Sequence, residues 1–257
     1  EYFEADHGTV VVMETATGEI KAMSNLGRTE DGTYFEKRNY AVYEAHEPGS
    51  TFKLMAMVAA LEDEVVDTSQ VIDTEKGVVR FYGRPVRDSH HGGYGEISVA
   101  KAFELSSNTA FTKMITEGYK NDPSRFVDRL YDMGLNDKIG LEIKGEGSPR
   151  IPHPQDKSWN GLSLPWMAFG YGVAITPLQT LTFYNAIAND GEMIKPRFIK
   201  AVKDRDKSII TMDKQVMNPS ICSPETAAKV REMMKNTVER GTAANIYTEN
   251  FSMAGKT

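Results

Sequence analysis

The chain has 257 residues, a length that suits one large domain with a sizeable core, and its 40% hydrophobic and 26% charged content is ordinary for a globular protein. A net charge of −6, without any basic tract interleaved with aromatic residues, argues against nucleic-acid binding. The longest apolar run, Leu54 to Leu61, is too short to span a bilayer, and Cys222 as the only cysteine excludes an intrachain disulfide.

The first residues of the chain predict a β-hairpin. Residues 7–14 carry three central valines and predict a strand, residues 15–18 form a glycine-containing turn, and residues 19–25 alternate as a second strand does. A polar loop with glycines is expected over 27–34.

The next segment carries the strongest chemical signal. A Pro48-Gly49 turn delivers Ser50 to the start of an apolar helix that should end near Glu62, and Lys53 lies over the same face one turn on. A serine hydroxyl is a weak nucleophile until a base takes its proton, and a lysine amine can be that base if burial or nearby cations lower its pKa. Free N–H groups at the helix start could also stabilise an oxyanion. The alternative interpretation is an N-cap serine followed by an exposed lysine.

The middle of the chain predicts short strands, helices and one long loop. In chain order we expect β pieces at 71–72 and 77–81, helices at 98–105, 109–117 and 122–133, and a surface loop rich in Gly, Pro and charge at 136–162. Ser98 and Lys101 repeat the Ser-x-x-Lys spacing, but they lack the Pro-Gly turn, and Lys101 is expected on a solvated face. The adjacent His90 and His91 point apart and have no third ligand at a suitable spacing, so zinc is disfavoured.

The last third predicts two helices, a hairpin and the start of a strand. A Thr-Pro-Leu-Gln capping box at 176–179 opens a helix that ends near Gly191, and Ser223 with Pro224 opens another that reaches about Val238. Strands at 198–202 and 208–211 flank a charged turn, and the residues from Ser252 onward predict a strand.

Two further motifs follow the first in a fixed order. Ser106 and Asn108 come directly after an amphipathic stretch, and Lys256 and Thr257 are the last two residues. Taken alone, the first pair could be a helix-cap turn and the second a polar sheet edge. The order Ser-x-x-Lys, Ser-x-Asn, Lys-Thr is the signature of penicillin-binding proteins and serine β-lactamases.

With these motifs the chain resembles the transpeptidase domain of a class B penicillin-binding protein over nearly its whole length. The Phe-Gly-Tyr-Gly sequence at 169–172 and the helix start at 176–179 belong to this resemblance, and the Glu47 lead-in favours the division (FtsI-type) branch. The resemblance implies an α+β fold like that of penicillin-binding proteins and serine β-lactamases, with an antiparallel sheet flanked by helices and a mainly helical subdomain at roughly 65–195. It also implies that residues 1–257 form one transpeptidase domain and that the strands following Lys-Thr-(Gly) are missing from this chain.

The resemblance assigns a role to each motif. Ser50 would attack the carbonyl of a D-Ala-D-Ala stem peptide and form an acyl-enzyme, with Lys53 as the base. Ser106 would relay a proton to the leaving amine, and Asn108 would hold the base and the substrate amide. The terminal carboxylate of the peptide would be bound by two residues, Lys256 and Thr257. Neither a cofactor nor a metal is implied.

The function implied is a peptidoglycan D,D-transpeptidase of septal cell-wall synthesis, which β-lactams would acylate at Ser50. The alternatives are a D,D-carboxypeptidase, a β-lactam sensor domain and an inactive scaffold. Between Asn108 and Lys256 no glutamate motif of the class A β-lactamase kind is found, so hydrolytic turnover of β-lactams is disfavoured. The expected location is the periplasmic, extracytoplasmic face of the bacterial inner membrane, with an N-terminal anchor absent from this chain and divisome membrane proteins as partners.

Overall fold

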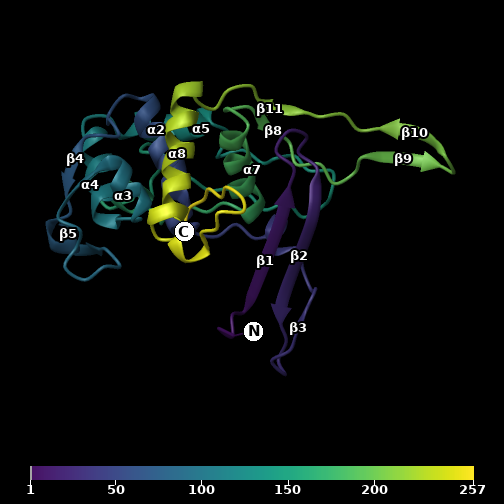
Figure 1. The fold of residues 1–257 in the computed structure, drawn as a ribbon, viewed down its shortest axis with the longest axis horizontal. Coiled ribbons are helices and arrows are strands. Elements are labelled where there is room, and N and C mark those ends of the chain that lie inside the picture. The colour runs from purple at the N-terminus through teal and green to yellow at the C-terminus, as the bar shows by residue number, and fades with distance from the viewer. Residues whose placement is uncertain (1) are drawn as a thin grey trace.

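The structure is a computed structural model that describes residues 2–257 (Figure 1). Most helices gather in one body, and two β structures extend away from it. One is a sheet of β1 (His7–Met13), β2 (Ile20–Arg28) and β3 (Tyr34–Phe35), and the other is a ribbon of β9 (Ala201–Asp204) and β10 (Lys207–Thr211). Helices combined with separate antiparallel sheets give the predicted α+β fold.

The N-terminal sheet confirms the predicted hairpin and extends it. β1 and β2 pair antiparallel, with Gly8 opposite Leu26, and the short β3 adds a third strand at the edge of β2. Part of the segment expected as a loop over 27–34 therefore continues β2. The turn between β1 and β2 needs Gly18, which has a φ of +73°, and a Cβ there would lie 2.4 Å from the carbonyl oxygen of Lys195.

The centre of the helical body is the helix that follows Ser50. A short 3-10 turn, η1 (Gly49–Phe52), leads into α2 (Lys53–Glu62), in which every residue from Lys53 to Leu61 is buried. α2 contacts α4 (Asn108–Gly118), α5 (Pro123–Asp132) and α8 (Pro224–Arg240). A helix that is apolar on nearly all sides is stable only when surrounded in this way, so the core fixes the position of the turn before it.

The remaining elements are short, and several of them pair locally. They are α1 (Tyr40–Tyr43), β4 (Val71–Asp73) paired with β7 (Glu96–Ser98), η2 (Glu75–Gly77), β5 (Val78–Phe81) paired with β6 (Arg84–Arg87), α3 (Val99–Glu104), α6 (Ser163–Met167), α7 (Pro177–Ala188), β8 (Met193–Ile194) paired with β11 (Val216–Asn218), and η3 (Ala244–Ile246). Within residues 2–257, no helix combines the length and the apolar character that crossing a bilayer requires.

Helices with a clear cap begin where the sequence predicts. At α7, the Gln179 N–H donates to Oγ1 of Thr176 at 3.1 Å, and the Thr176 N–H donates to Oε1 of Gln179 at 2.8 Å. The strand predicted from Ser252 is wrong: residues 252–257 have no strand partner in the described chain, and the Gly255 N–H donates to the Met234 carbonyl of α8 at 3.1 Å. A contact with a carbonyl inside α8 thus replaces the expected strand pairing.

The segment 136–162 is irregular, as predicted, but it is not confined to the surface. Ile139 and Ile151 are buried, and Ile151 belongs to the main core. Apolar residues spaced far apart in a Gly- and Pro-rich segment anchor it to the body without forming a helix or a strand. The sequence also gave no sign of the short strands β6, β7, β8 and β11.

Candidate active site

Ser50 lies in a tight turn that a second loop supports. The Gly49 N–H donates to the Gly170 carbonyl at 3.1 Å, and a Cβ on Gly170 would lie only 2.0 Å from the carbonyl oxygen of Gly49. Both glycines have a positive φ, +56° and +88°, which glycine adopts without steric cost. Two backbones in contact therefore hold the half-buried Ser50 at the start of the fully buried α2.

Lys53 is the most unusual residue of the site, because a lysine side chain is seldom fully buried. Its exposed fraction is 0%. Its Nζ donates to the Ser106 carbonyl at 2.6 Å and to Oδ1 of Asn108 at 2.6 Å, and it lies 3.2 Å from Oγ of Ser106. The Phe111 ring centroid is 5.4 Å away. No hydrogen bond joins this amine to Ser50 in the described chain, so the structure brings Lys53 to the second motif rather than to the serine one turn before it.

Burial is the main cause that lowers the pKa of Lys53 well below its ordinary value, and the positive charge of Lys256 lowers this pKa further, whereas the negative charge of Asp88 raises it. A neutral amine has two N–H donors and one lone pair. The two acceptors at 2.6 Å match the two donors of a neutral amine, which leaves its lone pair to take a proton. The contacts of Lys53 therefore suit a base that awaits a proton.

The second motif occupies the turn between α3 and α4. Ser106 has a φ of +55°, an uncommon conformation for a residue with a side chain that often marks a functional site. Ser107 caps α4 by accepting from the Ala110 N–H at 3.1 Å. Asn108 donates from Nδ2 to the Arg87 carbonyl at 2.8 Å, which turns its Oδ1 toward Lys53.

The third motif reaches the same place from the end of the chain. Oγ of Ser106 donates to the Thr257 carbonyl oxygen at 3.4 Å, and the hydroxyls of Thr257 and Thr242 lie 2.6 Å apart. Lys256 lies with its Nζ 5.8 Å from the Phe103 ring centroid, and burial lowers the pKa of Lys256 to about 8. The structure thus brings together the second and third motifs and Lys53, with Ser50 one turn before that lysine.

Sequence reasoning missed one acidic residue that contacts this cluster. Asp88 follows β6, and its carboxylate accepts hydrogen bonds from Ser107 and Thr109, on both sides of Asn108. Asp88 lies about twenty positions before the residues it contacts, in a segment without a motif, so no local signal could have found it. Among residues 2–257 no group of three or more histidines, cysteines and carboxylates is arranged to hold a metal ion.

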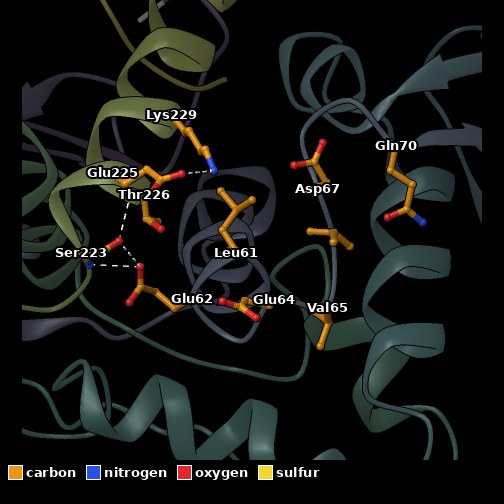
Figure 2. A pocket seen from close by; sticks show the side chains of 11 residues that line it. Leu61, Glu62, Glu64, Val65, Asp67, Gln70, Ser223, Glu225, Thr226 and Lys229 are labelled. Carbon is orange, nitrogen blue, oxygen red and sulfur yellow. Dashed lines mark hydrogen bonds and ion pairs between the residues drawn. The ribbon is translucent and has the colours of Figure 1, made fainter.

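A pocket of about 520 Å³ opens at the other end of α2, and Figure 2 shows the side chains around it. Several of its polar groups are partnered with one another: Oε1 of Glu62 accepts from the N–H and the hydroxyl of Ser223, and Lys229 pairs with Glu225 at 2.7 Å. None of the residues of the three motifs lines it. The three motifs therefore lie away from this pocket, and the candidate site is at the Ser50 end of α2.

The sequence of the chain matches those of known proteins. Residues 8–257 match the family model of the penicillin binding protein transpeptidase domain. The chain is 31% identical over 269 residues to penicillin-binding protein PbpB of Mycolicibacterium smegmatis, an alignment that covers 98% of this chain and 40% of PbpB. It is also 31% identical over 193 residues to the peptidoglycan D,D-transpeptidase FtsI of Escherichia coli, which covers 73% of this chain and 31% of FtsI.

Solved structures agree with the sequence matches. Penicillin-binding protein 3 from Mycobacterium tuberculosis, complexed with aztreonam, has a TM-score of 0.81 and 28% identity, with 97% of this chain and 57% of that chain covered. The apo transpeptidase domain of Burkholderia pseudomallei penicillin-binding protein 3 has a TM-score of 0.79 and 26% identity, with 99% and 70% covered. The chain spans less than half the length of PbpB and of FtsI. On these matches, and as its ordered motifs predicted, the chain belongs to the penicillin-binding protein transpeptidase family.

Proposed function

We propose that this chain carries the active site of a peptidoglycan D,D-transpeptidase that works through an acyl-enzyme on Ser50. The observation that carries the proposal is the fully buried Lys53, which is bonded to Ser106 and Asn108 and has a lowered pKa. A neutral amine one turn from a serine is the base that the nucleophile needs. Family membership supports the reaction class.

The proposed first step is acylation. Oγ of Ser50 attacks the carbonyl carbon of the penultimate D-Ala, and its proton moves to the neutral Lys53. The C–N bond to the terminal D-Ala then breaks, and the leaving nitrogen receives a proton through the Ser106 hydroxyl, which lies 3.2 Å from the lysine amine. The N–H of Ser50 at the helix start would donate to the oxyanion.

The second step transfers the acyl group. The amine of a second stem peptide attacks the ester carbonyl and passes one proton through the Ser106 hydroxyl to Lys53. A new C–N bond forms as the C–O bond to Ser50 breaks, and Oγ of Ser50 takes its proton back from Lys53. One N–H of the Asn108 amide is used by the Arg87 carbonyl, so its other N–H can donate to the substrate. Lys256, charged below a pKa of about 8, and the Thr257 hydroxyl would bind the carboxylate of the donor peptide.

The substrates are therefore stem peptides that end in D-Ala-D-Ala, and β-lactams would acylate Ser50 as substrates whose leaving group cannot depart. The relative crystallised with aztreonam and the similarity to FtsI support this assignment and a role in division. We place the enzyme outside the cytoplasmic membrane, held there by an anchor, with divisome membrane proteins as partners.

Mass spectrometry after incubation with benzylpenicillin tests the proposal. The adduct should lie on the peptide that contains Ser50, and Ser50→Ala should abolish it. Ser98→Ala is the matched control because Ser98 has the same spacing to a lysine, but it only caps α3, and Lys101 pairs with Glu104 at 3.0 Å. An adduct on Ser98 or Ser106, or its persistence in Ser50→Ala, would refute the proposal. Product analysis with two stem peptides then distinguishes crosslinking from carboxypeptidase cleavage.

A further inference from the structure

Asp88 contacts the second motif through both carboxylate oxygens. Oδ1 accepts from the Thr109 N–H at 2.9 Å, and Oδ2 accepts from the Thr109 hydroxyl at 2.8 Å. The Ser107 hydroxyl lies 3.1 Å from both oxygens. All of these donors are neutral, so the hydrogen bonds hold the carboxylate in place without neutralising its charge.

The contacts alternate along the turn. Ser107 and Thr109 face Asp88, whereas Ser106 and Asn108 face Lys53. The residue before Asp88 completes the support, because its carbonyl accepts from Nδ2 of Asn108 at 2.8 Å. Two adjacent residues, the last residue of β6 and the one after it, therefore fix both the position of the turn and the orientation of the amide that holds the lysine.

The charged groups that act on Lys53 come from two sides. The C-terminal segment contributes Lys256, and the segment after β6 contributes Asp88. The α4 side contributes neutral groups: the Ser106 carbonyl and hydroxyl, the Asn108 amide and the Phe111 ring. Asp88 is thus the negative group that opposes burial and Lys256 at this amine.

We propose that Asp88 is a positioning residue that holds the Ser106–Asn108 turn against Lys53 and whose negative charge favours the protonated form of this lysine. The inference rests on the proposed function, because it concerns the same base. It separates two contributions of one side chain, its hydrogen bonds and its charge, and these contributions can be removed one at a time.

The variant Asp88→Asn removes the charge and keeps the shape. Its amide oxygen can accept from the Thr109 N–H, and its NH₂ group can donate to the two hydroxyls, which accept as well as donate. Because the charge of Asp88 raises the pKa of Lys53, its removal lowers this pKa. More of the lysine is then neutral at a given pH below its pKa, so the acidic limb of the acylation rate should move to lower pH.

The experiment measures the second-order rate constant for acylation by a fluorescent penicillin against pH in the full chain, with the melting temperature of each variant. Thr109→Val removes the hydroxyl that contacts Asp88 and Ser107 but keeps the charge of Asp88. The rate should fall no more than about tenfold, and the midpoint of the limb should stay in place. Asp88→Glu should also keep the midpoint. Asp206→Asn, in the exposed turn between β9 and β10, controls for net charge and should change neither quantity.

An Asp88→Asn midpoint that stays in place or moves to higher pH would overturn the inference. So would a large drop in its melting temperature, since Asp88 would then act mainly in fold stability. The same shift in Asp88→Glu would show that the charge is not the cause. Absence of any Ser50 adduct in the parent protein is a different result, because it removes the proposed function itself.

Discussion

Replacement of Lys53 by methionine separates the chemistry of its amine from its packing. Met has a similar length and an unbranched stem, so it can fill the space of a side chain that is 0% exposed, whereas alanine would leave a cavity. The variant loses the hydrogen bonds from Nζ to the Ser106 carbonyl and to Oδ1 of Asn108. We therefore expect a folded protein that has lost its base.

The magnitudes for Lys53→Met follow from these contacts. Loss of a general base slows acylation by roughly 10²–10⁴, which is about 3–5 kcal/mol of transition-state stabilisation. The two lost hydrogen bonds cost about 1–3 kcal/mol of folding stability. Methionine has no amine to bury, so the variant is spared the desolvation cost of the amine, which is also about 1–3 kcal/mol. A net change within about 2 kcal/mol corresponds to no more than about 8 °C in melting temperature for a chain of this size.

The assay for Lys53→Met is acylation by a fluorescent penicillin, followed over time, together with calorimetric melting. Lys101→Met is the matched control, because Lys101 has the same spacing to a serine but is partly exposed and pairs with the buried Glu104 of α3. It should acylate like the parent protein. A Lys53→Met variant that acylates within about threefold of the parent would refute the assignment of this lysine as the base.

Three more predictions concern the substrate carboxylate, the turn before the nucleophile and the end of α8. Affinity for benzylpenicillin should fall as pH rises through about 8, because Lys256 loses its positive charge there; Lys256→Gln should remove this dependence of the inhibition constant. Gly170→Ala should slow acylation more than about tenfold, because its new Cβ would collide with the backbone of Gly49. Gly172→Ala is the control: it carries a similar backbone strain of about 1–3 kcal/mol, but its Cβ would point into open space. The Gly172 variant should therefore acylate far faster than the Gly170 variant. Arg240→Met leaves the buried Glu104 with one cation fewer and should lower the free energy of unfolding, though by less than the loss of a fully buried pair because Arg240 is exposed. Urea unfolding measures this loss, and an unchanged midpoint would contradict it.

The sequence predicted those helix starts that depend only on interactions between residues close together in the chain. The helix starts at Thr176 and Ser223 were predicted because their caps and following prolines act within a few residues. The wrong strand from Ser252 and the unpredicted pairing of β4 with β7 depend on partners far away in the chain, and no local pattern reports such a partner.

The candidate site follows the same division. Spacing predicted that Ser50 and Lys53 share a helix face, and the order of the motifs predicted the residues that gather near them. It did not predict that the amine turns to Ser106 and Asn108, nor that Asp88 supports their turn. Both facts depend on tertiary contacts between segments that the sequence separates widely.

The burial of α2 determines when the chain can become reactive during its synthesis. α8, near the end of the chain, packs on α2, and Lys256 is one of the groups that lower the pKa of Lys53. A chain that is synthesised from its N-terminus presents Ser50 early, but Lys53 remains exposed, protonated and without its partners until α8 has docked. The nascent protein is therefore expected to be inert toward β-lactams until almost all of these residues have emerged and folded.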